Sequence, residues 1–214
     1  MVRTLVGSVL ALAGVTALAT GCAGGGTTAA SPEPATVTYH VDGYPLDRTL
    51  EGLATWPDLQ AVVVLSGAER GKSVWLTTDG TPPAAVDGAD SASSDAALAL
   101  TTPVRGDVDA VLFGSEAGPD AGTVLLPGGT ADNVEVTVST ELAPDAADLD
   151  RADRLVVAGK VEDTAAGRAI RPAFVYALSE DGTTLTSLLD SASDDNRPQF
   201  TLAELEERLR QRAG

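Results

Sequence analysis

The chain has 214 residues, enough for a single domain with a hydrophobic core, and 43% hydrophobic content with only 4% aromatic residues predicts an aliphatic core. Its 31 Asp and Glu against 14 Lys and Arg give a formal net charge of −17, which excludes nucleic acid as a partner because phosphate backbones need a basic surface. The single cysteine excludes an intramolecular disulfide.

The first 21 residues have the pattern of a signal peptide. Arg3 supplies a positive charge, and a run of small and apolar residues follows from 5 to 18, about the length of a signal-peptide core. A membrane-spanning helix needs about 20 predominantly apolar residues, whereas this run is shorter and contains glycines. We therefore expect residues 1–21 to be a cleaved export signal.

This signal ends in small residues before a cysteine, Leu18-Ala19-Thr20-Gly21-Cys22. They resemble the lipobox of bacterial lipoproteins, with Ala19 where that family most often has Leu. The resemblance implies cleavage before Cys22, a diacylglycerol thioether on its sulfur, palmitate-type acylation of the new N-terminus, and a place on the extracytoplasmic face of the cell membrane. Two chains of roughly 15 buried methylenes each, at about 0.8 kcal/mol per methylene, would make detachment negligible. The acidic, Ala-rich and Lys-poor composition is also similar to that of actinobacterial proteins.

Residues 22–35 predict a flexible lipidated tether, and residues 36–214 predict a single β-rich domain. The tether is rich in Gly, Thr and Pro without apolar periodicity, and its coil reach is about 20 Å. Within the domain, residues 79–97 contain Pro82-Pro83 and a serine-rich stretch, which predict a mobile insertion between strands.

Short runs rich in Val, Leu and Thr, separated by Gly, Pro and Asp, predict about eight strands from Thr36 onward. Residues 62–65 and 155–158 are continuous apolar runs, typical of strands buried on both faces, whereas 134–138 alternates like a one-sided strand. The other predicted strands lie near residues 37–41, 74–76, 108–113, 124–126 and 174–178. The pattern indicates a mainly β (α+β) domain, either a small closed barrel or a sandwich, and OB-like in its order of elements.

Two helices are predicted, one on each side of these strands in the sequence. Leu46, Leu50 and Leu53 follow helical spacing before a proline ends the segment. Near the C-terminus, Thr201 and Glu204 have the pattern of a capping box, and the leucines that follow form one narrow apolar stripe. We expect the short N-terminal helix and the amphipathic C-terminal helix to pack outside the barrel or sheet.

The segment 66–73, SGAERGKS, is one residue away from a P-loop, with Ser66 in place of the first glycine. A P-loop must open a helix so that backbone N–H groups face the phosphates, but residues 74–78 are β-branched and alternating, typical of a strand. We therefore reject nucleotide binding and interpret the segment as a hairpin turn.

His40 is the only histidine, so a Ser-His hydrolase would have to use it as its base. No G-x-S-x-G or S-x-x-K motif marks a serine partner for it. One histidine and one lipidated cysteine do not make a typical zinc site. The sequence predicts no catalytic residues of these types and no cofactor.

Carboxylates remain as candidates, because they are the oxygen ligands that calcium prefers. They form two groups, Asp145, Asp148, Asp150 and Asp153 in the first, and Asp194-Asp195-Asn196 in the second. Their spacing does not match an EF-hand, so a solvated acidic loop competes with a calcium site. Acids such as Asp107, Asp109 and Glu116 allow a carboxylate-dependent envelope hydrolase, since the spacing of a catalytic pair is set in three dimensions.

Together these features favour a non-catalytic, lipid-anchored binding or accessory module of the cell envelope. Its expected partners are the membrane, through lipid on Cys22, and an envelope protein or small ligand. The alternatives are a carboxylate-dependent hydrolase and a calcium-dependent adhesion or scaffold module. Two converging carboxylates in a pocket would favour the hydrolase, and a groove without them would favour binding.

Overall fold

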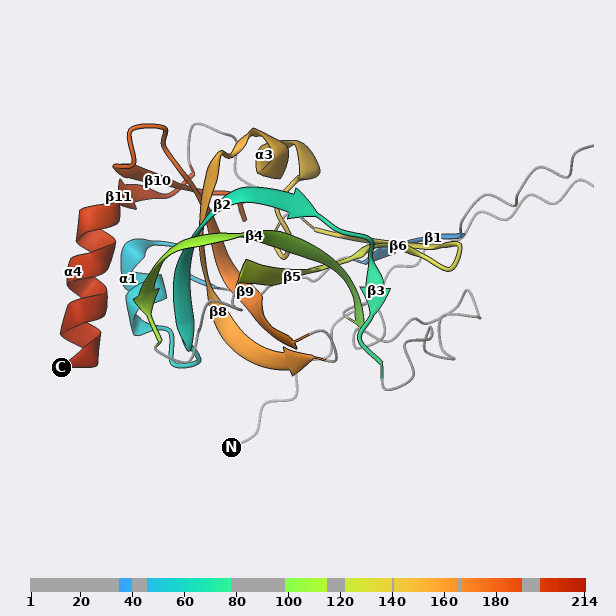
Figure 1. Ribbon diagram of the computed structural model, residues 1–214, viewed down its shortest axis with the longest axis horizontal. Coiled ribbons are helices and arrows are strands. Elements are labelled where there is room, and N and C mark those ends of the chain that lie inside the picture. The colour runs from blue at the N-terminus through green and yellow to red at the C-terminus, as the bar shows by residue number, and fades with distance from the viewer. Residues whose placement is uncertain are drawn as a thin grey trace, which may run out of the picture.

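The computed structural model describes residues 35–39, of which only the backbone is considered, together with 46–77, 99–114, 122–139, 141–164, 167–189 and 197–214 (Figure 1). The fold is mainly β with helices added, as the sequence predicts. Its helices are α1 (Leu50–Thr55), α3 (Ala146–Arg151) and α4 (Leu202–Ala213). Its strands are β1 (Ala35–Tyr39), β2 (Ala61–Arg70), β3 (Val74–Trp75), β4 (Leu100–Phe113), β5 (Thr123–Pro127), β6 (Gly129–Ala131), β7 (Val134–Val138), β8 (Arg154–Thr164), β9 (Gly167–Leu178), β10 (Thr184–Ser187) and β11 (Gln199–Thr201).

Five strands close into a barrel. The ring runs β2, β4, β5, β9 and β8, and β8 pairs again with β2. All of these pairings are antiparallel except that of β5 with β9, which is parallel through Val124 and Ile170. If these five strands are numbered 1 to 5 in chain order, the order around the ring is 1-2-3-5-4. This is the strand order of an OB barrel. The closed ring therefore decides between the barrel and the sandwich that the sequence left open.

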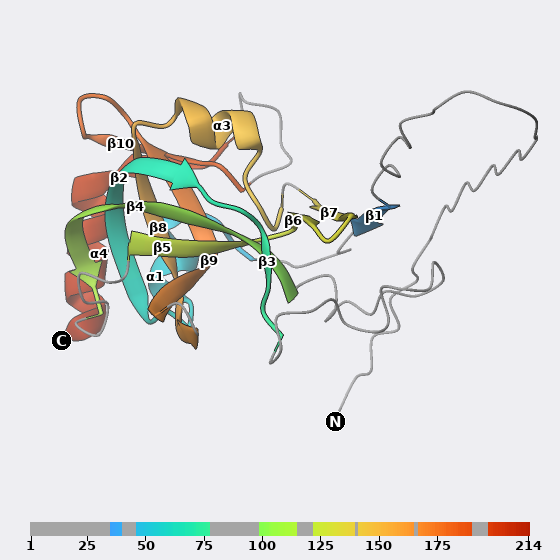
Figure 2. The same ribbon diagram turned by 45° about the vertical axis from the view of Figure 1, so that its right-hand side comes forward.

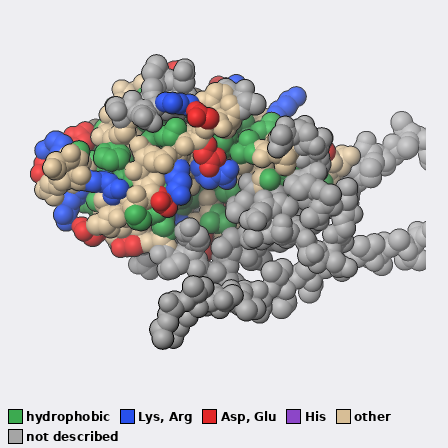
Figure 3. Space-filling model, turned by 90° about the horizontal axis from the view of Figure 1, so that it is seen from below, with side chains coloured by type: hydrophobic (Ala, Val, Ile, Leu, Met, Phe, Trp, Pro, Cys, Tyr) green, Lys and Arg blue, Asp and Glu red, His purple; other side chains and the backbone are tan. Residues whose placement is uncertain are grey.

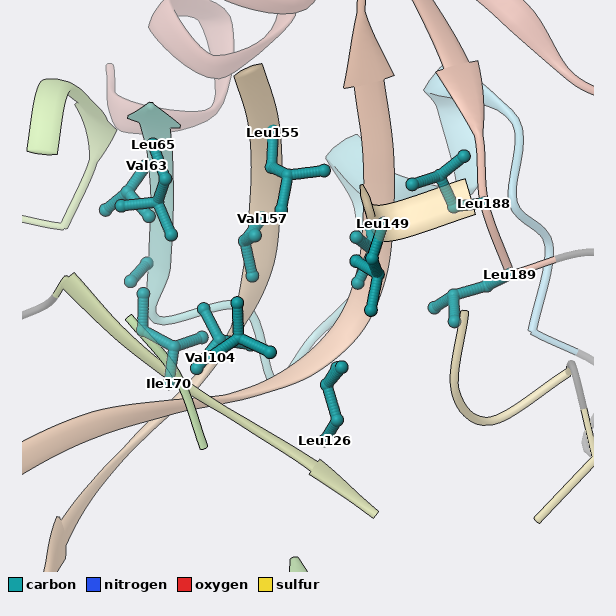
Figure 4. Packing of buried hydrophobic residues seen from close by; sticks show 13 residues of the cluster. Val63, Leu65, Val104, Leu126, Leu149, Leu155, Val157, Ile170, Leu188 and Leu189 are labelled. Carbon is teal, nitrogen blue, oxygen red and sulfur yellow. The ribbon is translucent and has the colours of Figure 1, made fainter. Parts of the chain in front are cut away.

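The two predicted apolar runs do lie in strands buried on both faces. In β2, Val63 and Leu65 point into the barrel, whereas Val62 and Val64 belong to a second cluster on its outer face. The same alternation occurs in β8, where residues 155 and 157 point inward. Figure 4 shows the interior filled by aliphatic side chains, with Leu149 of α3 beside them. The barrel interior is therefore aliphatic, as predicted, whereas the outer cluster also contains the buried aromatic residues Phe174, Tyr176 and Phe200.

The outer cluster lies between the barrel and two helices. Helices α1 and α4 lie side by side at one end of the molecule (Figures 1 and 2), against outward-facing residues of β2, β8 and β9. At the start of α4, the Glu204 backbone N–H donates to the Thr201 hydroxyl and the Glu204 carboxylate accepts from Thr201, so the predicted capping box is confirmed. Helix α1 begins after Thr49, its N-cap, rather than at Leu46 as the spacing predicts.

Helix α3 corrects the interpretation of residues 144–153 as an acidic loop. Asp145 caps this helix by accepting a hydrogen bond of 2.7 Å from the Ala147 backbone N–H. Leu149 is 6% exposed and joins the barrel core. Asp145 therefore caps a short helix that covers one end of the barrel, and Asp148 and Asp150 are part of that helix, whereas Asp153 follows it.

A small sheet lies at the opposite end from α4 (Figures 1 and 2). Its order is β1-β7-β6, with β1 parallel to β7. Asp132 and Asn133 have φ of 50° and 63° and form the two-residue turn between β6 and β7, a conformation typical of type I′ hairpins. Trp75, Leu100 and Val136 form the core of this end.

Within the described part of the chain, no helix has the length and apolar character needed to cross a membrane. The signal segment, Cys22, most of the tether and the insertion at 79–97 lie outside the described residues.

Candidate functional site

A groove of about 420 Å³ runs over the outer face of β4 and β5. Because Val104 and Val124 point into the barrel, their strand neighbours Arg105 and Thr123 point outward into the groove. Residues 69–72, Val74 and Leu76, from the end of β2 to the residue after β3, form one wall. Thr164 at the end of β8 and residues 167–169 at the start of β9 form the other. The barrel closure thus brings together four segments that are distant in the sequence.

Positive side chains are concentrated in this groove. Its described lining includes Arg70, Lys72, Arg105 and Arg168 but only one carboxylate, that of Glu69. This balance is the reverse of the whole chain, in which acids outnumber bases by 31 to 14. The groove is therefore a local positive region on an acidic protein.

Two of these cations are held by acids at the border of the groove. Arg70 forms an ion pair of 3.2 Å with Asp150 at α3, and Arg168 forms one of 3.2 Å with Asp163 on β8. Within the described residues, Lys72 and Arg105 make no ion pair. Arg105 lies opposite Glu69 in the β2–β4 register, so the groove carboxylate is beside this arginine. Lys72 and Arg105 are both exposed and can contact a ligand directly.

The space between these charges is mainly aliphatic. Val74, Leu76, Pro103 and Leu125 contribute to the described lining, and Val74 is 44% exposed. None of the described lining residues is aromatic. Figure 3 views the molecule from below and shows Lys and Arg side chains next to acidic and hydrophobic ones. The groove can bind an extended anionic chain by charge and aliphatic contact, but its described lining offers no ring on which a base could stack.

The P-loop-like segment forms part of one wall. Strand β3 follows it directly, as the alternating residues after it predict. The predicted hairpin turn is wrong, because β2 and β3 do not pair with each other and instead both pair with β4. The Ser73 hydroxyl accepts a 3.1 Å hydrogen bond from the Thr130 backbone N–H, which ties this wall to β6.

The first acidic group does not form a metal site in the described structure. Asp145 caps α3, Asp148 binds Arg151 at 2.8 Å and Arg197 at 2.9 Å, and Asp150 binds Arg70. Asp153 is exposed. The described residues contain no group of three or more acidic, histidine or cysteine side chains placed to hold a metal ion. The group at 194–196 lies outside the described residues.

The carboxylates considered for a hydrolase are not brought into the groove. Asp107 and Asp109 are exposed on β4, and neither contributes to the described groove lining. Asp109 accepts a hydrogen bond of 2.7 Å from the Ser66 hydroxyl. Glu116 and His40 lie outside the described residues. No described pair of carboxylates converges in this groove.

Compared with protein-family models, with curated proteins and with solved structures, the chain matches none. The groove is therefore assigned from its geometry alone. Sequence analysis missed it, because its cations come from positions 70–72, 105 and 168, which only barrel closure brings together.

Proposed function

We propose that this chain is a lipid-anchored binding module on the extracytoplasmic face of the cell membrane, and that its groove binds an extended anionic ligand of the envelope. The observation that carries the proposal is the presence of four Lys and Arg side chains and one carboxylate in a single groove of a strongly acidic chain. A net negative surface elsewhere would reduce nonspecific binding of anions, and would leave the groove as the preferred position.

The anchor is proposed from the lipobox resemblance around Cys22. This residue precedes β1 by 13 positions, since β1 begins at Ala35. The β1 sheet lies at the opposite end of the molecule from α4 (Figure 2). A lipid on Cys22 would accordingly hold the β1 sheet nearer to the membrane than α4.

The ligand class follows from the chemistry of the groove lining. Arg70, Lys72, Arg105 and Arg168 offer donors for carboxylates or phosphates. Because the described lining lacks aromatic rings, it favours an aliphatic or acidic chain over stacked bases. This lining supports a binding role, and no observation on the described residues favours the hydrolase or calcium alternatives.

The anchor is tested by replacing the thiol with a hydroxyl. We expect wild type to sediment with membranes and Cys22→Ser to lose acyl labelling and its membrane association after signal removal. Unchanged membrane association of a cleaved, unacylated Cys22→Ser chain would contradict the anchor and leave the groove proposal standing.

The groove is tested with poly-L-glutamate of about 20 residues at about 150 mM salt, where distant charges are screened over about 8 Å. We expect Lys72→Gln/Arg105→Gln to weaken binding by at least about tenfold, equivalent to about 1.4 kcal/mol. The matched control is Arg208→Gln/Arg210→Gln on α4, which changes net charge equally but lies outside the groove.

Isothermal titration calorimetry provides the measurement, with neutral dextran as the control ligand. Equal weakening in both double variants would mean that overall charge, not the groove, governs binding. Absence of poly-L-glutamate binding to wild type would remove the anionic-ligand proposal.

A further inference from the structure

A second cavity, of about 250 Å³, lies between the two ends of α1 and the outer face of β8 and β9. It is bounded by the residues before and after α1, by β8 and β9, and by Leu142 and Leu189. The residues lining this cavity are all different from those lining the groove. It is therefore a separate site with its own chemistry.

One wall of the cavity is an aromatic ring in a fixed position. Trp56 follows α1 and packs edge-on against Phe174, with ring centroids 5.6 Å apart. Phe174 is in turn stacked on Tyr176 at 6.4 Å, and both of these rings are buried. Trp56 itself is half-buried and lines the cavity. The buried rings hold its indole in place, so that a flat molecule can pack on it without reorganisation of the wall.

Arg48 is fixed at both ends beside this wall. Its backbone carbonyl accepts a hydrogen bond of 3.1 Å from the Tyr176 hydroxyl, and its guanidinium donates to the backbone carbonyl of Glu141. Burial raises the pKa of Tyr176 far above its usual range, so this phenol stays protonated and remains a donor. An arginine held in this way loses little side-chain entropy when it binds an anion.

The remaining charged side chains favour an anion over a cation. Lys160 pairs with Asp58 at 3.0 Å, and both line the cavity. Arg171 also lines it, but its partner at 2.7 Å is Glu162, which is outside the described lining. The lining thus holds three cationic side chains and two carboxylates.

We propose that this cavity binds a small organic acid with a flat apolar body. The body packs on Trp56 and the surrounding aliphatic side chains, and the carboxylate is oriented by Arg48 and Arg171. The volume suits a molecule of about a dozen non-hydrogen atoms. This gives the molecule a small-ligand site in addition to a groove for an extended chain.

The test uses 2-naphthoate and its neutral counterpart 2-naphthamide, which differ in charge but hardly in shape. The chain has two tryptophans, so ¹H–¹⁵N spectra of the purified chain contain two indole N–H signals, and Trp75→Phe assigns them. Trp75 serves as an internal control, because it lies in the core at the β1-β7-β6 end of the molecule and does not line this cavity. Its indole N–H donates a hydrogen bond to the Asp132 carboxylate.

We expect 2-naphthoate to shift the Trp56 signal and not the Trp75 signal, and to bind at least about tenfold more tightly than 2-naphthamide. Arg48→Gln should reduce 2-naphthoate to the affinity of the amide, whereas Arg208→Gln on α4 should leave it unchanged. An unmoved Trp56 signal at millimolar 2-naphthoate, or equal affinity for acid and amide, would overturn the proposal. The acid and amide are compared on the wild-type chain, so misfolding of Arg48→Gln does not affect that decision.

Discussion

At the scale of single residues, the start of α4 is stabilised by a reciprocal pair of side chains. The Thr201 hydroxyl accepts from the Glu204 backbone N–H at 3.2 Å, and the Glu204 carboxylate accepts from the Thr201 backbone N–H at 2.8 Å. Thr201→Ala removes the first of these bonds and should lower the free energy of unfolding by about 1 kcal/mol. Denaturant titration measures this loss, and Thr201→Ser should recover most of it because the hydroxyl is kept.

The same cap makes a prediction for pH. The hydrogen bond from the Thr201 backbone N–H, followed by that from its hydroxyl, lowers the pKa of Glu204 below its ordinary value of 4.5. Since the folded-state pKa is lowered, the carboxylate stabilises the fold above pH 4.5, and this contribution disappears as the pH falls through the folded-state pKa. Glu204→Ala should therefore lower Tm at neutral pH by an amount that shrinks in acid.

Glu206→Ala is the matched control for this pH dependence, since it removes an exposed carboxylate from the same helix. Thermal unfolding followed by circular dichroism, from neutral pH to well below the ordinary glutamate pKa of 4.5, covers the relevant window. A Tm difference between wild type and Glu204→Ala that stays constant over this range would show that the carboxylate charge is not responsible.

At the scale of elements, α3 contributes to the barrel through one side chain. Leu149 is the buried residue of this helix and packs in the barrel interior (Figure 4). We expect Leu149→Ala to lower the free energy of unfolding by about 2 to 4 kcal/mol, because it leaves a cavity that the barrel strands cannot fill. Ala147→Ser, on the exposed face of α3, should change it by less than about 0.5 kcal/mol. Equal effects in urea titrations would mean that α3 does not pack as described.

Elements with strong local patterns were predictable from the sequence. Strands β2 and β8 have continuous apolar runs, and α4 has a capping box. Helix α3 was missed because a single leucine among alanines and aspartates gives no helical periodicity. Strands β10 and β11 have 4 and 3 residues, too few to show an alternating pattern.

The barrel and its groove could be predicted only in part, because closure depends on pairing between distant strands. The parallel contact of Val124 with Ile170 completes the ring and has no local signal. Arg105 and Arg168 are isolated in the sequence, and only the fold places them with Lys72. The class of fold could therefore be predicted from the sequence, but the position of the groove could not.

At the scale of the whole molecule, the charge distribution predicts that salt has opposite effects on the stability of the fold and on anion binding. The net charge of −17 opposes compaction, and added salt should stabilise the fold by screening this repulsion. The same salt should weaken anion binding in the groove, because the attraction between Lys72 and Arg105 and the ligand is also screened. For a positive groove on an acidic molecule, we therefore expect added salt to raise Tm and, at the same time, to lower the affinity for the anionic ligand.

Calcium provides the sharpest test at this scale, because a calcium-dependent module and an acidic surface respond differently. Asp145, Asp148 and Asp150 are already engaged by a backbone N–H or by arginines, so binding a cation there would require these contacts to break. We expect calcium and magnesium chloride at equal concentrations to raise Tm equally, through screening alone. A rise at millimolar calcium that magnesium does not reproduce would reinstate a specific calcium site, and its loss in Asp148→Asn would locate that site at α3.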